Sequence, residues 1–353
     1  MTAYIDPRGK LFVHMDRLAQ LQTGLHPPPV NVEIDPSNRC NLGCTDCHFS
    51  HLHTKGHYAN TLPVGYVGTG DLMDTGLLLS LPLSLKRFGV RSITWTGGGE
   101  PTLHPILYQA MQQAHETGLD QGLYTNAITI DEDMAFIIKT TCQWVYVSLD
   151  YPDRETYKTG KSVDLFELAC QGTRNLVTAM GNAVVGIGFL LGSQDWRRAG
   201  DMLKLGQELS ASYIQFRPRI LVDPSEPGRV LEDTSWIGEC IEALHSLMKT
   251  TGVILDLERF HMYGNWNKHP YFTCWWSALQ TVITPDGRVW ICVNRRGRPD
   301  ALLGDLNNDS LATIWTRHSR GTVGAGCRVM CRGHIPNLEL NEIMRTRPHG
   351  NFI

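Results

Sequence analysis

The sequence predicts an α/β protein built around a parallel sheet, because short strand-like runs alternate with helical segments from about residue 30 to residue 221. A cysteine-rich turn follows one of these strands, and a triple glycine follows the next. A β-hairpin with its own cysteines comes after the alternation ends. With 353 residues, the chain is long enough for one large core and a smaller appended domain.

We expect six strands in the alternating region, at residues 30–35, 92–97, 122–127, 144–150, 183–192 and 213–221. Helical segments separate them, and Pro82 within the first of these segments predicts a kink or a break. Beyond residue 221 the alternation is less regular. The sequence there predicts a helix ending near Lys249, a short strand at 253–260 and a hairpin that turns at Gly287.

Composition and charge limit the classes of partner. The net charge is -3 and the pI is near 6.5, so there is no global electrostatic basis for binding nucleic acid or an acidic membrane. No apolar run reaches the roughly 20 residues that cross a bilayer, and the N-terminal residues lack the pattern of a secretory signal. We therefore expect a cytoplasmic protein whose cysteines stay reduced and free for metals or catalysis.

Seven of the ten cysteines fall into two sets, and the other three, Cys142, Cys170 and Cys240, are expected to be small buried hydrophobes. The first set has C-x3-C-x2-C spacing and follows the first strand: Cys40, Cys44 and Cys47. Such density indicates a metal, either zinc with a fourth ligand from a nearby histidine or an iron–sulfur cluster with one iron left open. The open cluster is favoured because Gly98, Gly99 and Glu100 end the next strand, where bare backbone and a carboxylate suit a ligand with an ammonium group.

The cysteine triplet, the Gly-Gly-Glu element and the six βα units resemble the radical S-adenosylmethionine (radical SAM) superfamily over about residues 30–221. The resemblance implies a partial (β/α)6 TIM-like barrel, in which the three cysteines hold a 4Fe-4S cluster and SAM occupies the open iron. It implies reductive cleavage of SAM to a 5'-deoxyadenosyl radical that removes hydrogen from a substrate. It also implies an external electron donor such as flavodoxin or ferredoxin. Asp46 departs from the family, which commonly has an aromatic residue there, so the adenine contact is left open.

The same resemblance places further cofactor contacts at the ends of later strands. These expected contacts are Thr125, Asn126, Ser148, Asp150, Gly186 and Gly188. Each has an alternative interpretation as ordinary strand packing or turn chemistry.

The second set comprises Cys274, Cys292, Cys327 and Cys331, spaced C-x12-G-x4-C followed by C-x3-C. Four thiolates suit either a cubane cluster or a zinc ribbon. The hairpin resembles the SPASM and twitch extensions found behind radical SAM barrels, and four cysteines match the twitch form with one auxiliary cluster. The resemblance thus implies two 4Fe-4S clusters, the second as electron acceptor or structural support.

Four parts are therefore expected along the chain. They are an N-terminal extension (1–29), the partial barrel (30–225), a linker helix and strand (226–273) and a small hairpin and helix domain for the auxiliary cluster (274–353).

The substrate is the least constrained feature. Gln215, Arg217 and Arg219 alternate along the sixth strand, so they share one face. Inward arginines suit an anionic or carbonyl-rich substrate, and pairing with buried acids such as Glu33 or Glu258 is the structural alternative.

Arg217, Arg219 and Glu258 are therefore the candidate catalytic residues. We expect oxidation or rearrangement of a small polar or nucleotide-like molecule, by an oxidoreductase or isomerase. The alternatives are a macromolecular substrate (a peptide residue or a hypermodified nucleic-acid base) and a non-catalytic iron–sulfur or zinc protein.

Overall fold

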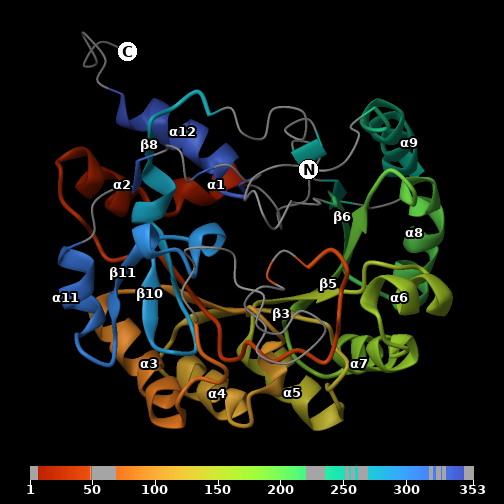
Figure 1. Ribbon diagram of the computed structural model, residues 1–353, viewed down its shortest axis with the longest axis horizontal. Coiled ribbons are helices and arrows are strands. Elements are labelled where there is room, and N and C mark those ends of the chain that lie inside the picture. Colours follow the sequence, from red (N-terminus) through yellow and green to blue (C-terminus); the bar gives the residue numbers. More distant parts are fainter. Residues whose placement is uncertain are drawn as a thin grey trace.

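The computed structural model describes residues 7–47, 49, 69–219, 235–250, 254–255, 259–260, 269–317, 321–322, 327 and 331–345. Its central feature is a ten-stranded sheet with the order β11-β10-β9-β1-β2-β3-β4-β5-β6-β7, which is open rather than closed (Figure 1). Glu258 lies outside the described residues. Within the described part of the chain, no helix is both long enough and apolar enough to cross a bilayer.

All six predicted strands are present and pair in parallel with their neighbours. They are β1 (Asn31–Ile34), β2 (Ser92–Trp95), β3 (Asp120–Thr125), β4 (Trp144–Ser148), β5 (Val184–Leu191) and β6 (Tyr213–Pro218). The short strand predicted next is β7 (Ile254–Leu255), which pairs with β6. The sequence order and spatial order of these strands agree, as expected for successive βα units.

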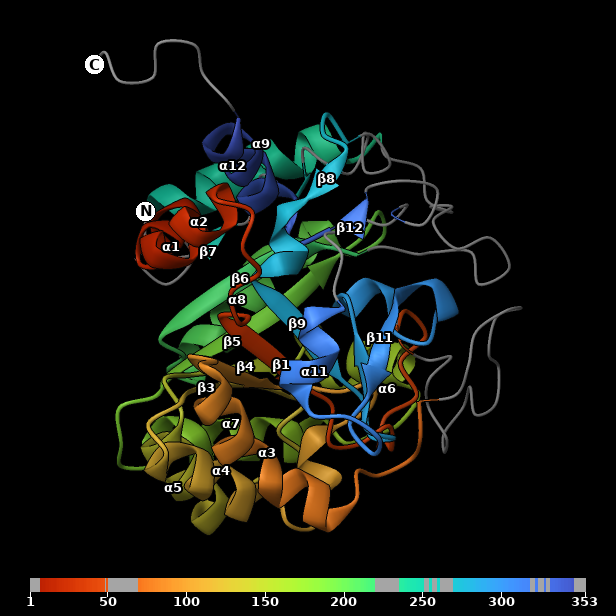
Figure 2. The same cartoon turned by 90° about the vertical axis from the view of Figure 1, so that its left-hand side faces the viewer.

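Helices α3, α4, α5 and α7 lie together along one side of the sheet (Figures 1 and 2). The helices of this region are α3 (Thr75–Phe88), α4 (Leu107–Glu116), α5 (Glu132–Thr141), α6 (Arg154–Lys161), α7 (Phe166–Thr178), α8 (Ala199–Glu208) and α9 (Ile237–Thr250). Aspartates cap several of them, and Asp131 accepts a hydrogen bond from the Met134 N–H at the start of α5. Of the two outcomes predicted for Pro82, a kink or a break, the break is wrong, because α3 runs through this residue and buries it.

The C-terminal residues extend this sheet. The predicted hairpin is present as β9 (Gln280–Ile283) and β10 (Arg288–Trp290), and β9 also pairs in parallel with β1. The remaining elements here are β8 (Thr273–Cys274), β11 (Leu302–Asp305), α11 (Leu311–Thr316), β12 (Gly321–Thr322) and α12 (His334–Met344). Since β9 continues the sheet at β1, the second set of cysteines is attached directly beside the strand that leads to the first.

The N-terminal residues pack on the C-terminal helix. They form α1 (Pro7–Phe12) and α2 (Met15–Gln22), and Leu11, Leu18 and Leu21 share a buried cluster with Leu340 of α12. Figure 2 shows these helices together at one end of the molecule.

Candidate functional site

The first cysteine set lies in the loop after β1, and backbone hydrogen bonds hold this loop to α6. Gly43 N–H donates to the Lys161 carbonyl at 2.9 Å, and Thr45 N–H donates to the Gly160 carbonyl at 3.0 Å. At its start, the buried Asn38 side chain donates to Thr69 Oγ1 and to the Gly70 carbonyl, both at 2.7 Å. Hydrogen bonds within the protein therefore hold the loop at its start and at residues 43–45.

The triple glycine after β2 packs against this loop. A Cβ on Gly99 would lie 2.1 Å from the Arg39 carbonyl oxygen, and one on Gly97 would lie 3.0 Å from the Ser37 carbonyl oxygen. Gly99 N–H donates to that Ser37 oxygen, and Glu100 N–H donates to the Arg39 oxygen at 2.8 Å. Gly97 and Gly99 are thus required by backbone contact with the cysteine loop, and all three glycines line the pocket.

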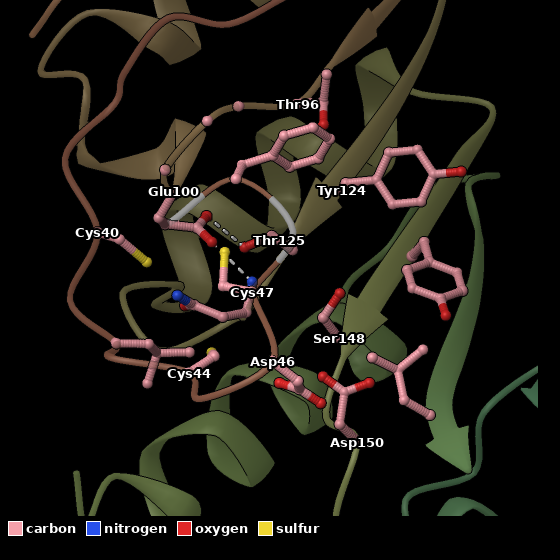
Figure 3. A pocket seen from close by; sticks show the side chains of 18 of the residues that line it. Cys40, Cys44, Asp46, Cys47, Thr96, Glu100, Tyr124, Thr125, Ser148 and Asp150 are labelled. Atoms are coloured by element: carbon pink, nitrogen blue, oxygen red, sulfur yellow. Dashed lines mark hydrogen bonds between the residues drawn. The ribbon is translucent and has the colours of Figure 1, made fainter. Parts of the chain in front are cut away.

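Glu100 is the centre of a buried hydrogen-bond network. Its Oε1 accepts from the Thr125 hydroxyl and the Thr102 hydroxyl, each at 2.7 Å, and its Oε2 accepts from the Asn126 N–H at 2.8 Å (Figure 3). Asn126 also donates to Asn41 Oδ1 of the cysteine loop at 2.7 Å. Burial raises the pKa of Glu100, and these hydrogen bonds oppose that shift. Thr125 and Asn126 therefore act on Glu100 and on the loop.

Two ionic contacts lie beside the cysteine loop, one of them buried and the other half-buried. Lys161 pairs with Asp150, and Asp46 lies 2.8 Å from Arg219 Nε. Arg219 Nη2 also donates to Asp195 Oδ2 at 2.5 Å. The structural alternative proposed for the arginines is therefore confirmed for Arg219, with Asp46 and Asp195 as the acids in place of Glu33 or Glu258.

One pocket connects these groups with the second domain. Its lining includes all three cysteines of the first set, Glu100, Ser148, Asp150, Arg217, Arg259, Asn294 and Arg332. Figure 3 shows the three cysteines and Glu100 on one side, with Tyr124 and Ser148 on the other. Arg217 lies 4.3 Å over the Tyr146 ring, and its Nη2 donates to Gln215 Oε1 at 2.6 Å. Of the two candidate arginines, Arg217 faces the pocket and Arg219 is not among its lining residues.

The glycines of β5 serve close packing. A Cβ on Gly188 would lie 1.6 Å from the Tyr146 hydroxyl oxygen, and one on Gly186 would lie 2.0 Å from the Tyr213 ring. Among the described residues, neither glycine lines the pocket. Gly188 therefore makes room for the ring on which Arg217 lies.

The second cysteine set comes from β8, which carries Cys274, from the residue pair after β10 that ends in Cys292, and from Cys327 and Cys331, which precede α12. Burial raises the pKa of Cys292, and the negative charges of Cys331, Cys274 and Cys327 add to this shift. His334 lies directly after this set, and its Nδ1 forms a hydrogen bond with the Tyr271 hydroxyl at 2.8 Å. That contact gives His334 a structural role beside the set.

The thiols of both sets suit cationic metal clusters. Burial raises the pKa of Cys40 to about 12 and that of Cys274 to about 12, and neighbouring thiols add to both shifts. Buried thiolates need a compensating positive charge, and iron supplies it. The described residues contain no group of three His, Cys, Asp or Glu side chains arranged around a single metal ion.

Several site residues were missed by reasoning from sequence. Lys161, Arg259, Asn294 and Arg332 line the pocket, as do Tyr124 and Tyr146. Tyr124 and Tyr146 lie within predicted strands, where side chains alternate between the two faces of the sheet. This alternation could have indicated that they face the same side as other pocket residues. The other four follow or lie outside the six strands, where no period indicates orientation.

The fold and the two cysteine sets define an α/β protein whose parallel sheet carries one candidate cluster site and whose C-terminal domain carries a second. The Radical SAM superfamily model matches residues 34–205, and the SPASM iron–sulfur cluster-binding model matches residues 274–332. The chain therefore belongs to the radical SAM superfamily and carries a C-terminal SPASM domain. These domains imply SAM with a 4Fe-4S cluster in the first and auxiliary iron–sulfur binding in the second.

Curated relatives match part of the chain. GTP 3',8-cyclase of Chlorobaculum tepidum is 31% identical over 138 residues, covering 38% of this chain and 37% of the relative. Probable GTP 3',8-cyclase of Saccharolobus islandicus is 25% identical over 189 residues, covering 53% and 56%. The chain thus spans about a third to just over half of the length of these relatives.

Solved structures share the fold at low identity. SuiB of Streptococcus suis bound to the precursor peptide SuiA has a TM-score of 0.62 at 15% identity, covering 89% of this chain and 70% of that one. The native anSMEcpe structure with bound AdoMet has a TM-score of 0.61 at 18% identity, covering 81% and 80%. These similarities support the partial-barrel fold.

Proposed function

We propose that this protein is a radical SAM enzyme that abstracts hydrogen from a small polar or nucleotide-like substrate. The observation that carries the proposal is that the cysteine triplet, Glu100 and two residues of the second domain, Asn294 and Arg332, line the same pocket. A substrate in this pocket would lie between the two cysteine sets. When bound, the cluster and SAM supply an electron and a 5'-deoxyadenosyl radical that removes hydrogen.

Different residues of the pocket are proposed to bind the cluster and SAM. Cys40, Cys44 and Cys47 would hold the SAM-binding cluster. Gly98, Glu100, Ser148 and Asp150 line the pocket beside them and are proposed to contact SAM, with Thr125 and Asn126 fixing the Glu100 carboxylate. Glu100 is suited to the SAM ammonium group, since its carboxylate accepts hydrogen bonds and is excluded from water.

The auxiliary cluster is proposed to bind Cys274, Cys292, Cys327 and Cys331. Four thiolates complete the ligand set of a 4Fe-4S cluster, so electron acceptance or structural support is favoured over direct substrate binding. The outcome is oxidation or rearrangement, and an external donor such as flavodoxin or ferredoxin would deliver the electron.

The arginines of the pocket support an anionic substrate. Arg217, Arg259 and Arg332 all line it. The lining also contains four acids, and three of these are paired with a cation: Glu33 with Arg332, Asp46 with Arg219 and Asp150 with Lys161. The fourth, Glu100, accepts hydrogen bonds from its neighbours. Burial lowers the pKa of Arg332 to about 10, so its guanidinium remains charged at neutral pH. Guanidinium groups bind phosphate and carboxylate by paired hydrogen bonds. The relatives named as GTP 3',8-cyclases agree with a nucleotide-like substrate.

A macromolecular substrate is the alternative. The SuiB structure is described as bound to a precursor peptide, so the fold admits a peptide in that protein. A peptide residue or a modified nucleic-acid base would need to reach the same pocket.

Anaerobic reconstitution tests the cofactor assignment. We expect about eight irons per chain for two 4Fe-4S clusters and formation of 5'-deoxyadenosine from SAM under reducing conditions. Cys44→Ser should retain about four irons in the second set and lose SAM cleavage. Zinc in place of iron, without SAM cleavage, would reject the proposal in favour of a non-catalytic metal protein.

Isotope transfer tests the substrate class. Deuterium-labelled nucleoside phosphates, peptides and oligonucleotides are incubated separately with reduced enzyme and SAM. We expect deuterium in 5'-deoxyadenosine from the nucleotide arm. Transfer only from a peptide or oligonucleotide would establish the alternative.

A further inference from the structure

Arg296 is a buried cation placed between the two cysteine sets. It follows Cys292 by four residues, and its side chain is 1% exposed. Its Nη1 donates to Asp35 Oδ2 at 2.5 Å, and Asp35 directly follows β1, on the way to the first cysteine set. Its guanidinium carbon lies 4.3 Å from the centre of the Phe49 ring, two residues after Cys47. Contacts from the first domain thus hold a side chain of the second.

Two of the Arg296 nitrogens have no acceptor within the part of the chain that the structure describes. Among the described residues, neither Nε nor Nη2 makes a hydrogen bond, although Nη2 lies 4.0 Å from Glu33 Oε2. Buried donors without acceptors are costly and are rare in folded proteins. Donors left over at a fully buried position therefore indicate an acceptor that belongs to a bound group.

The charge of Arg296 acts on both sets of cysteines. Burial lowers the pKa of Arg296, while Asp35, Cys292 and Cys47 raise it through their negative charge. Cys292 belongs to the second set and Cys47 to the first. One guanidinium is therefore electrostatically coupled to a ligand of each proposed cluster.

We propose that Arg296 is a positioning residue shared by the two iron–sulfur sites, which stabilises the reduced form of both clusters. Positive charge and hydrogen bonds to cluster sulfur raise the reduction potential, and Arg296 offers a charge and two unused donors. Asp35 and Phe49 hold the guanidinium in place. The inference rests on the proposed function, because it requires both cysteine sets to hold clusters.

A redox titration of the reconstituted full chain, followed by electron paramagnetic resonance, tests the proposal. At a fixed applied potential, Arg296→Gln should lower the reduced-to-oxidised ratio of both clusters about tenfold. For a one-electron couple this corresponds to a reduction potential lower by about 59 mV. Arg296→Lys keeps the charge and should shift both ratios less. Asp35→Asn removes the opposing negative charge and should raise both ratios. Arg197→Gln, which removes an exposed charge on the surface, is the matched control and should change neither.

Unchanged ratios for both clusters in Arg296→Gln would overturn the proposal, and so would a shift confined to the auxiliary cluster. If Arg296→Gln loses iron, the Asp35→Asn variant tests the proposal instead. A shared Arg296 charge requires Asp35→Asn to raise the reduced-to-oxidised ratio of both clusters, so the absence of this rise would overturn the proposal. The two proposals fail differently. Clusters that form and cleave SAM with unshifted potentials reject only the role of Arg296, whereas missing clusters reject the proposed function as well.

Discussion

Arg219 Nε lies 2.8 Å from Asp46 Oδ2, in a half-buried ion pair that links the end of β6 to the cysteine loop. Asp46 occupies the position before the third cysteine, where the family resemblance implies an aromatic residue. Its carboxylate serves as a partner for Arg219, whose other partner is Asp195. Asp46 is thus explained by tertiary contact with a residue 173 positions later in the chain.

Replacing Arg219 should destabilise the protein strongly. Arg219→Met leaves two half-buried acids, Asp46 and Asp195, without their shared partner. Removing one partner of a fully buried pair costs about 3–5 kcal/mol, and partial exposure lowers this cost, so we expect a loss of about 3 kcal/mol. The matched control is Arg197→Met, because the Arg197–Glu239 pair is exposed and such pairs contribute about 0–1 kcal/mol. Chemical denaturation of the two reconstituted variants measures the difference. Equal losses would contradict a structural role for the Asp46–Arg219 pair.

Adding a methyl group to Gly99 should displace the cysteine loop. The new Cβ would meet the Arg39 carbonyl oxygen at 2.1 Å, which is far inside contact distance. We expect Gly99→Ala to lose iron from the first set and to melt at a lower temperature. Gly200→Ala is the control, since nothing lies within 4 Å of its Cβ and alanine favours the helix by about 1 kcal/mol. Full iron content in Gly99→Ala would show that the backbone contact is dispensable.

Arg217 should matter for substrate and not for cluster assembly. It lies in the pocket, whereas Arg197 is on the surface and provides a control. A hydrogen bond to a charged group contributes about 1.5–3 kcal/mol, so Arg217→Gln should lower kcat/KM by roughly tenfold to a hundredfold. Iron content and substrate-independent SAM cleavage should stay the same. Loss of SAM cleavage together with hydrogen transfer would instead place Arg217 against SAM.

His104 should make stability depend on pH. Its ring is buried, its Nε2 lies 2.8 Å from the Met73 carbonyl oxygen, and burial lowers its pKa. The folded protein therefore resists the proton that the unfolded chain accepts near pH 6.5. The stabilisation is complete above that pH and decreases as the pH falls toward the lowered folded pKa.

The melting temperatures of wild type and His104→Gln at pH 7.5 and 5.5 measure this effect. We expect the wild type to lose more stability than the variant on acidification, because only the wild type has the His104 ring. Any loss of the clusters in acid affects both proteins and cancels in the comparison. Parallel losses in the two proteins would show that His104 does not titrate differently on folding.

The prediction of the fold succeeded where the pattern was local. Each of the six strands contains enough β-branched and aromatic residues to mark it, and all six are present. The pairing of β9 with β1 was not predicted. Asn31 and its partner Gln280 are 249 positions apart in the chain, and no local period in the sequence indicates a contact over that distance. The break predicted at Pro82 is absent for a related reason. Proline disfavours the interior of a helix, but the packing of α3 against the rest of the protein outweighs this local preference.

The candidate arginines show the same limit. Alternation correctly placed Gln215 and Arg217 on one strand of the sheet, but β6 ends at Pro218, so Arg219 leaves the strand periodicity. Which acid it meets depends on the neighbouring loops. The glycines of β5 were interpreted through the cofactor, whereas the structure places the rings of Tyr146 and Tyr213 against them.

By itself, the sequence determined the two cysteine spacings, the Gly-Gly-Glu element and the order of the βα units, because each depends on residues close together in the chain. Only the tertiary structure decided that Asp46 meets Arg219, that Asp35 meets Arg296 and that Glu33 meets Arg332. The partners of buried charges are chosen by which strands and loops become neighbours. That choice depends on packing of the whole chain, since a buried charge needs a partner from wherever the fold supplies one.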